Sequence, residues 1–209
     1  MNYKDGRRIL ELAVESGLRS IAAGLESISS QGQKQSGAWR KLHYTSADSF
    51  DIQKIKENVR TIQSLGIEVR GFFVVGWDED TPETYRRTLD FCDECGVTPF
   101  IFTLTPMPGS QIYREYLDQG RIFAGRPWDQ YGTGQVIYRH PAMSAEEMFD
   151  LDAEVMREGY SIGRILKRAF QAFRYRPSLD VMRVSFFTQW GVRKAYRQLY
   201  EQIPRPSTA

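Results

Sequence analysis

The sequence predicts an α/β fold in which about three parallel strands alternate with helices and an α-helical C-terminal extension follows. Apolar runs rich in β-branched and aromatic residues alternate with segments of helical periodicity. The predicted helices of the first 120 residues end at glycines, which commonly terminate helices. The spacing of roughly thirty to forty residues per unit is that of a TIM-type (β/α) barrel. Because three strands cannot close a barrel, we expect a partial barrel with two open sheet edges.

The first unit is a helix, a short strand and a long connection. We predict a helix over residues 5–16, ended by Gly17, and a strand over residues 18–23 that stops at the sequence G-L-E-S. Residues 28–47 are rich in Ser, Gln and Gly, which predicts a long loop with a short helix at residues 39–42.

The second unit contains the most informative stretch of the chain. A helix over residues 47–65 carries an apolar stripe and ends at Gly66. The strand over residues 67–75 contains a continuous apolar run, which is typical of a strand covered on both faces. Thr81 is a favourable helix N-cap, and Pro82 suits the first helical position.

The third unit completes the predicted part of the barrel. Its helix covers residues 82–95, its strand covers residues 98–104, and a short helix follows at residues 110–119. Beyond residue 121 the pattern changes to a loop with an edge strand at residues 135–139. Helices are then predicted over residues 144–160, 161–175 and 177–203. The expected divisions are 1–120 (part of the barrel), 121–203 (linker and helical extension) and 204–209 (disordered tail).

Composition and charge narrow the class of protein. The 209 residues are 41% hydrophobic and 26% charged, which is ordinary for a globular protein. No run approaches the roughly 20 apolar residues of a membrane-spanning helix, and no signal peptide opens the chain. We therefore expect a cytoplasmic protein. Two cysteines exclude a disulfide framework.

The net charge of +2 hides an asymmetry along the chain. Residues 160–209 hold ten Lys and Arg against two Asp and Glu, a net charge of +8, so the rest carries −6. A basic, aromatic-rich segment beside an acidic body suggests an anionic partner or a membrane surface. The simpler alternative is a solvated basic helix surface. Membrane contact would involve residues 161–200 and make the protein peripheral to the membrane, and we expect no nucleic-acid partner.

Polar or flexible residues follow each predicted strand, where parallel α/β folds bind ligands. Glu26 could bind ribose or amino groups, or cap a helix, and Gly76 suits a sharp turn or a close approach to a ligand. The two prolines of the loop after residue 104 could present backbone groups to a flat ring, or form only a tight connection. The acids Asp78, Glu79 and Asp80 could hold a metal, but a solvated turn at a helix N-terminus is the favoured interpretation.

The cysteines and histidines indicate no metal site. Cys92 and Cys95 replace core aliphatic residues on one face of a predicted helix, so we interpret them as buried structural thiols. His43 and His140 lack companion ligands at metal-binding spacing and are predicted to be loop residues.

Taken together, the strand ends resemble a known family. The motifs, in order, are G-L-E-S, G-F-F-V-V-G-W-D-E-D-T-P-E-T, T-L-T-P-M-P-G-S-Q-I-Y, W-D-Q-Y and M-S-A-E-E-M. They resemble the radical S-adenosylmethionine enzymes, and in particular the subgroup with an N-terminal cobalamin-binding domain that includes hopanoid methylases. The resemblance covers residues 5–175 and implies strands four to six of a partial (β/α)6 barrel, followed by the helical extension of that subgroup.

The resemblance implies a set of cofactor contacts at the three strand ends. They are a carboxylate on strand four, a segment beside the adenine on strand five and a nucleoside contact at the end of strand six. The matching residues are Glu26, Val74, Val75, Gly76, Thr105 and Pro106.

The chain lacks the sequence motifs with which this family binds its metal cofactors. The family's C-x-x-x-C-x-x-C motif and the D-x-H-x-x-G loop of a cobalamin domain are absent, and two cysteines cannot supply three thiolates. The [4Fe–4S] cluster and cobalamin are therefore expected of the full-length family but not of this chain alone, which leaves S-adenosylmethionine as the cofactor it could bind. The chain is expected to begin within what would be the family's third helix.

These observations give two functional hypotheses. The first is a C-terminal fragment of a radical S-adenosylmethionine enzyme for C-methylation or ring modification, inactive alone and completed by a partner chain or N-terminal half that holds the cluster. The second is a non-catalytic interaction module. It would pair through its open sheet edges as a homo-oligomer, or bind a membrane surface through its basic aromatic tail.

Overall fold

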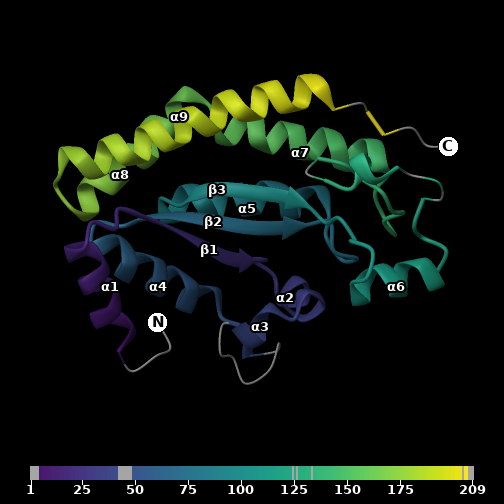
Figure 1. The fold of residues 1–209 in the computed structure, drawn as a ribbon, viewed down its shortest axis with the longest axis horizontal. Helices are drawn as coiled ribbons and strands as arrows, with labels where there is room; N and C mark the ends of the chain where they lie inside the picture. Colours follow the sequence, from purple (N-terminus) through teal and green to yellow (C-terminus); the bar gives the residue numbers. More distant parts are fainter. Residues whose placement is uncertain are drawn as a thin grey trace.

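The computed structural model describes residues 5–41, 49–123, 125, 127–132, 134–203 and 205–206. Its centre is a sheet of three parallel strands in the order β1-β2-β3 (Figure 1). The strands are β1 (Ser20–Glu26), β2 (Glu68–Val75) and β3 (Thr98–Thr103). The predicted α/β class, with three parallel strands and a helical segment after them, is confirmed.

The helices also follow the predicted alternation. They are α1 (Gly6–Glu15), α2 (Ser30–Ser36), α3 (Ala38–Lys41), α4 (Ile52–Ser64), α5 (Pro82–Cys95), α6 (Gln111–Asp118), the 3₁₀ helix η2 (Trp128–Gln130), α7 (Ala145–Gly159), α8 (Ile162–Tyr175) and α9 (Leu179–Gln202). Among the described residues, no helix is both long and apolar enough to cross a membrane.

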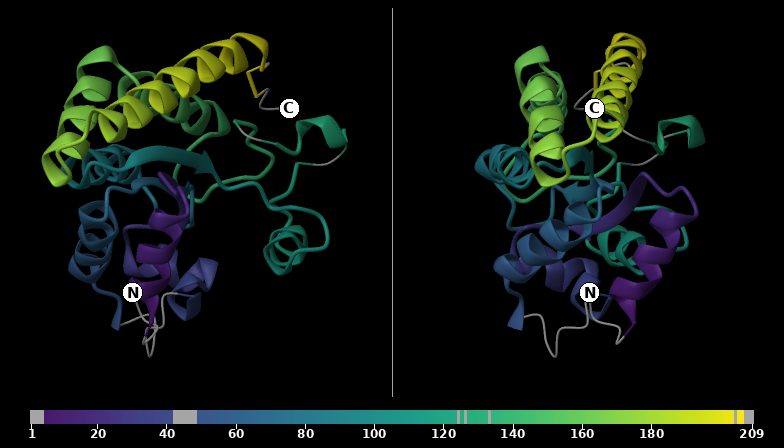
Figure 2. Two further views of the ribbon diagram at one scale, coloured as in Figure 1. Left: turned by 60° about the vertical axis from the view of Figure 1, so that its left-hand side comes forward. Right: turned by 90° about the vertical axis from the view of Figure 1, so that its left-hand side faces the viewer.

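One face of the sheet is packed along its length, while the other is covered by α9 only near the start of β2, where Arg70 donates to Thr188. Alternate residues of β2, such as Val69 and Phe73, are buried beneath a layer that includes α4 and α5, while α7 packs against β3 (Figure 2). The opposite face, which we call the open face, has half-buried side chains such as Phe72 and Val74 on β2 and exposed residues such as Ala22 on β1. The prediction that the second strand is covered on both faces therefore holds near the start of β2, whereas Phe72 and Val74 farther along are only half-buried.

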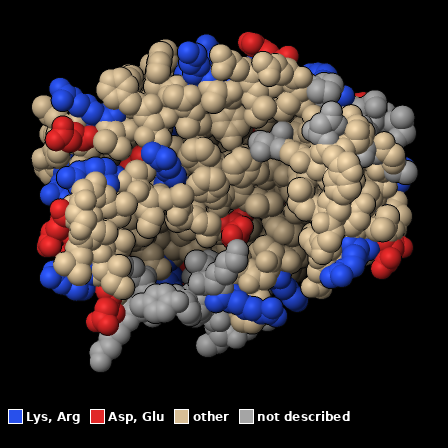
Figure 3. All heavy atoms as spheres, viewed as in Figure 1, with Lys and Arg blue, Asp and Glu red and all other residues tan. Residues whose placement is uncertain are grey.

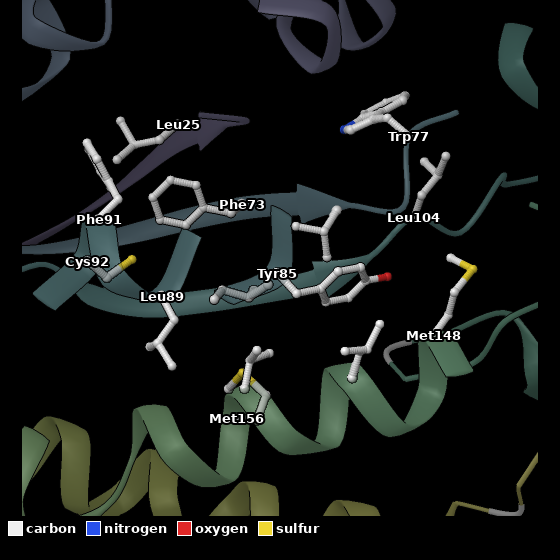
Figure 4. Packing of buried hydrophobic residues seen from close by; sticks show 14 of the residues in the cluster. Leu25, Phe73, Trp77, Tyr85, Leu89, Phe91, Cys92, Leu104, Met148 and Met156 are labelled. Atoms are coloured by element: carbon white, nitrogen blue, oxygen red, sulfur yellow. The ribbon is translucent and has the colours of Figure 1, made fainter. Parts of the chain in front are cut away.

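The core joins the barrel portion to the helices after it. Figure 4 shows Phe73, Leu89 and Cys92 from the strand-helix units facing Met148 and Met156 of α7. The same cluster of buried side chains continues into the start of α8. The residues on both sides of position 120 thus share one hydrophobic core.

The connection after β1 is more ordered than its composition predicts. Within the predicted loop at residues 28–47 lie α2 and α3, and only residues 42–48 fall outside the description. Ser29 caps α2 by accepting a hydrogen bond from the Gly32 N–H at 3.0 Å. The buried side chain of Gln33 donates to the Leu25 and Ser27 carbonyls at 2.8 and 2.6 Å. These tertiary bonds, which sequence periodicity does not register, anchor the short helix to β1.

Two further predictions differ in detail. The predicted edge strand at residues 135–139 is reduced to one antiparallel bridge between Ile122 and Tyr138. The predicted first strand begins and ends later than expected, because the G-L-E segment continues the pairing with β2. Of the predicted disordered tail at 204–209, only residues 205 and 206 lie within the described part of the chain.

Candidate functional site at the carboxyl end of the sheet

β1 ends in an irregular step that presents a carboxylate. The pairing passes from Gly24 opposite Phe72 to Glu26 opposite Phe73, so Leu25 has no partner in the register. Glu26 has a φ of 63°, and it is the one described residue other than glycine with a positive φ. Such a backbone is sparsely populated by side-chain-bearing residues and clusters at functional sites.

The Glu26 side chain lies back over Gly24. A Cβ atom placed on Gly24 would sit 2.8 Å from the Glu26 Oε1 atom, which is closer than real contacts allow. Gly24 is exposed, and by the alternation of β1 its missing side chain would project from the open face. The glycine therefore leaves the space that the carboxylate occupies.

Three phenylalanines of the open face form a layer that we call the aromatic floor, and one of them, Phe72, lies opposite Gly24 in the register. Phe72 stacks on Phe100 with ring centroids 4.8 Å apart and an interplanar angle of 6°. Phe72 also stacks on Phe102 at 5.8 Å. All three rings are half-buried, so each keeps an accessible surface. A carboxylate next to the faces and edges of aromatic rings favours a bound cation with an apolar body.

The turn after β2 is held by a buried acid. The Asp80 Oδ2 atom accepts hydrogen bonds from the N–H groups of Gly76 at 2.8 Å and Trp77 at 3.0 Å. Its side chain is buried, and this desolvation raises the pKa of Asp80 to about 6, although the two backbone bonds act in the opposite direction. The interpretation of this acid as part of a solvated turn is therefore wrong. Asp80 is buried and stabilises the turn through its bonds to the Gly76 and Trp77 N–H groups.

Gly76 is required by packing as well as by the turn. Its φ is +92°, and an added Cβ atom would lie 2.7 Å from the Tyr138 hydroxyl and 2.8 Å from the Met148 Cε atom. The Tyr138 hydroxyl donates to the Gly76 carbonyl, and the Gly76 N–H is already bound to Asp80. Both backbone polar groups of Gly76 thus have partners within the chain.

His140 fastens the same turn from the other side. Its Nδ1 atom accepts from the N–H groups of Ala142 and Met143, each at 3.1 Å. Its Nε2 atom lies 2.8 Å from the Trp77 carbonyl and must donate to it, which fixes a neutral tautomer. Burial lowers the pKa of His140, although its bond to the Trp77 carbonyl opposes the shift. His140 is a loop residue, as predicted, and a long-range contact with the turn after β2 buries it.

Asp78 links the turn to α6 and the segment after it. It accepts from the Tyr116 hydroxyl at 2.8 Å and from the Arg121 Nη2 atom at 2.6 Å. The Arg121 guanidinium also lies 3.8 Å from the Tyr116 ring centroid. Burial alone would raise the pKa of Asp78, but the bonds from Arg121 and Tyr116 together lower it. Asp78 is therefore a partly buried carboxylate that connects the turn to Tyr116 and Arg121.

A cavity of about 490 Å³ opens beside this turn, between α2, α3 and α6. Its wall includes the indoles of Trp39 and Trp77, and its polar lining includes the side chains of Ser36, Gln111 and Glu115. Its volume lies within the range of roughly 300–1,000 Å³ that is usual for small-molecule sites. The cavity and the aromatic floor thus flank the ends of the strands.

The structure brings the six predicted cofactor contacts to one edge of the sheet, but it exposes only some of them. The side chains of Glu26, Val74 and Thr105 are partly exposed. Those of Val75 and Pro106 are buried, and Gly76 is buried as described above. Their role as cofactor contacts stays a prediction. The supporting residues Asp80, His140 and Tyr138 were missed, since nothing in their local sequence indicates burial.

The cysteines take no part in this site. Cys92 and Cys95 are buried in the core, as predicted. Burial raises the pKa of the Cys92 thiol far above its usual range and that of Cys95 to about 11. Within the described residues, no three His, Cys, Asp or Glu side chains are grouped to hold a metal ion. His43 lies outside the described residues.

The chain is similar to several proteins that are named as methyltransferases. No family model matches it. It is 25% identical over 201 residues to the bacteriochlorophyllide d C-12(1)-methyltransferase of Chlorobaculum tepidum, which covers 96% of this chain and 41% of that protein. It is 21% identical over 193 residues to an uncharacterized methyltransferase of Pyrococcus horikoshii, which covers 92% of this chain and 37% of the other. A hopanoid C-2 methylase of Rhodopseudomonas palustris is 29% identical over 58% of this chain. The chain thus spans less than half the length of these relatives.

These names correct the identification made from the sequence motifs. The motifs implied a silent fragment of a radical S-adenosylmethionine enzyme, or a non-catalytic module. The two relatives that match more than nine-tenths of the chain are named simply as methyltransferases, and the hopanoid methylase matches a smaller part. None of the three names refers to a radical, an iron–sulfur cluster or cobalamin. The comparisons therefore point to methyl transfer and replace the earlier identification.

Proposed function

We propose that this chain is part of a methyltransferase that uses S-adenosylmethionine and binds it at the carboxyl end of β1–β3. The similarity to named methyltransferases over 96% and 92% of the chain supports the reaction class. The clustering of a carboxylate, an aromatic layer and a cavity at the strand ends supports the place. Parallel α/β sheets bind their ligands at this edge.

The Glu26 carboxylate beside the aromatic floor is the observation that carries this proposal. S-adenosylmethionine supplies a methyl group attached to a positively charged sulfonium. Glu26 and the rings of Phe72 and Phe100 would favour that charge, because carboxylates and aromatic faces both attract cations. The neutral product of methyl transfer lacks the charge and would be held less tightly.

The remaining residues would bind and orient the rest of the cofactor. The partly exposed side chains of Val74 and Thr105 would contact the nucleoside at the strand ends. The Trp77 indole donates to the Val74 carbonyl at 3.0 Å, which fixes its ring at the cavity wall. Asp80 and His140 would act as positioning residues, because they hold the turn that carries Trp77.

We also propose that the sheet is an arc of a larger parallel sheet of the barrel type. The sequential order of β1, β2 and β3 and the unfilled open face support this architecture. A further stretch of polypeptide, a partner chain or a second copy would complete the edge at β1. The acceptor would be a large, mainly apolar ring compound, as the names of the bacteriochlorophyllide and hopanoid enzymes suggest.

Equilibrium dialysis with S-adenosylmethionine and with S-adenosylhomocysteine, which lacks the methyl group and the charge, tests this proposal. We expect Glu26→Gln to weaken binding of the charged cofactor roughly tenfold and binding of the neutral product less than about twofold. Glu79→Gln is the matched control, since Glu79 is an exposed acid on the same edge. It should change neither affinity. Absence of binding, or an equal loss for both ligands, would overturn the proposal.

A further inference from the structure

The outer face of α8 carries an apolar stripe that is exposed and not buried in the core. Ile162, Leu166 and Phe170 recur every fourth residue and are 51%, 53% and 62% exposed. The buried residues Ile165 and Ala169 lie on the inward side of the same helix. α8 is therefore apolar on its outward side as well as its inward side, over roughly 12 Å of its length.

α9, which packs along α8, adds large exposed side chains. Phe187 and Trp190 are exposed, and Phe186 stacks on Trp190 with ring centroids 5.9 Å apart. Leu179, at the start of α9, is also exposed. We call the exposed apolar residues of the two helices the α8–α9 apolar surface. Its members are Ile162, Leu166, Phe170, Leu179, Phe187 and Trp190.

Basic side chains flank this surface. Lys167 and Arg174 lie beside the stripe on the helical projection of α8, at the border between its apolar and polar arcs. Lys194 is exposed one turn beyond Trp190 on α9. Within the described part of the chain, none of these three forms an ion pair. Figure 3 shows Lys and Arg side chains, with a few acidic ones, among largely uncharged surface over the helices at the top of the view.

We propose that the α8–α9 apolar surface binds the surface of an anionic membrane. An apolar stripe edged by Lys and Arg is the pattern of helices that lie in the membrane interface, where long basic side chains reach the headgroups. Trp190 suits that boundary, since tryptophan is enriched at membrane–water interfaces. The net charge of +8 in residues 160–209 provides attraction to anionic lipid, while the rest of the chain carries −6.

The same charges disfavour a second copy as the occupant. In a symmetric pair, each copy would place its Lys167 and Arg174 close to those of its partner, because the same patch meets itself. Residues 160–209 themselves contain only two Asp or Glu, and the nearest acids to Lys167 are those of α5 in a shared groove, Asp90, Asp93 and Glu94. A lipid surface supplies the negative charge that a second copy lacks.

Flotation with lipid vesicles tests the proposal. We expect the chain to float with phosphatidylcholine vesicles that contain about a third phosphatidylserine, and to stay behind with pure phosphatidylcholine at physiological salt. Leu166→Ser combined with Phe170→Ser should lower the bound fraction roughly tenfold or more. Lys167→Glu combined with Arg174→Glu should do the same, and this loss should be greater at low salt.

Matched controls separate a specific surface from general stickiness. Ile9 and Leu117 are as exposed as the stripe residues but lie elsewhere, on α1 and α6. Changing both to Ser should leave flotation unchanged, as should Arg87→Glu with Arg114→Glu. Equal losses in the control variants would overturn the proposal. The proposal would also be overturned if the chain bound no vesicles but formed a dimer in light scattering, and the Leu166 and Phe170 changes dissociated that dimer.

Discussion

Two buried carboxyl groups make the stability of the chain depend on pH. Asp152 on α7 is fully buried and accepts a hydrogen bond from the Tyr200 hydroxyl. Burial raises the pKa of Asp152 to about 7 and that of Asp80 to about 6, from an ordinary value of 3.8. The folded state therefore binds more protons than the unfolded state between roughly pH 4 and pH 7. In that window the contribution of these two carboxyl groups to the free energy of unfolding falls as pH rises, while the smaller contribution of His140, whose pKa burial lowers, has the opposite sign.

Urea unfolding at several pH values measures this effect. We expect the free energy of unfolding to be higher at about pH 5 than at pH 7.5 by roughly 1–3 kcal/mol. Asp152→Asn should flatten the dependence, because the amide stays neutral and can still accept from Tyr200. Stability that rises with pH over this range, or an unchanged slope in the variant, would contradict the assignment of a protonated Asp152.

Gly76 offers a second test at the scale of one residue. Gly76→Ala should lower the free energy of unfolding by about 2–4 kcal/mol, since the methyl group meets Tyr138 and Met148 in addition to the strain of a positive φ. Gly109 has nearly the same φ, +90°, with no atom within 4 Å of an added Cβ. Gly109→Ala should therefore cost only about 1 kcal/mol. Equal losses in the two variants would show that strain alone matters.

Sequence reasoning selected the strand ends as the candidate site but did not indicate which residues support them. Glu26 was selected because a carboxylate follows a strand, and the structure adds its unusual backbone and its position over Gly24. Asp80 was misjudged, because acids in a polar turn are usually solvated. His140 was correctly expected in a loop, but its burial involves a contact with Trp77, 63 residues away in the sequence. The pattern of neighbouring residues in the sequence does not indicate such long-range contacts.

At the scale of elements, the longer helices and the central strands were predictable. α5 begins and ends where its cap residues predict, at Pro82 and just before Gly96. β2 and β3 match their apolar runs to within a residue or two. The short helix predicted at residues 39–42 matches α3 to within a residue. α2 was not predicted, because a helix this short has little stability of its own and depends on tertiary bonds such as those of Gln33.

Arg168 shows how the last helices are fixed to the sheet layer. Its side chain is fully buried on α8 and donates to Asp93 of α5, Gln189 of α9 and the Gly159 carbonyl. Burial lowers the pKa of Arg168, although the charge of Asp93 opposes this shift. One guanidinium thus connects three helices and the end of a fourth.

Replacing Arg168 should therefore be costly. Arg168→Met should lower the free energy of unfolding by about 3 kcal/mol or more, because it leaves polar groups of three helices without a partner. Arg164→Met is the matched control, since Arg164 also binds Asp93 but is more exposed. We expect it to cost about 1 kcal/mol or less. Similar losses in guanidinium unfolding would contradict a special role for the buried side chain.

At the scale of the whole molecule, one core joins the two predicted segments. Residues of α5 and α7 pack on each other, and the buried cluster extends to Ile165 on α8. We expect the full chain to unfold in one cooperative transition by circular dichroism. A chain of residues 1–120 should be largely unfolded, because its core would be exposed where α7 now lies. A folded 1–120 fragment would show instead that the segments are independent.

The open face could not have been predicted from the sequence alone. The apolar run of β2 indicates that both of its faces meet apolar surroundings, but it does not say whether helices, a ligand or another polypeptide supplies them. The structure shows α4 and α5 on one face, and on the other face α9 near the start of β2, where Arg70 donates to Thr188. The parallel order of the strands was predictable, because alternation with helices requires it.

The most direct test of the account is to locate the bound cofactor. Backbone amide signals of the isotopically labelled chain can be followed by nuclear magnetic resonance during titration with S-adenosylmethionine. We expect the largest shifts at Glu26, Phe72, Trp77 and Thr105, at the carboxyl end of the sheet. Shifts confined to the groove of about 500 Å³ between α7 and α9, around Tyr196, would contradict the account. So would the absence of any shift at millimolar cofactor.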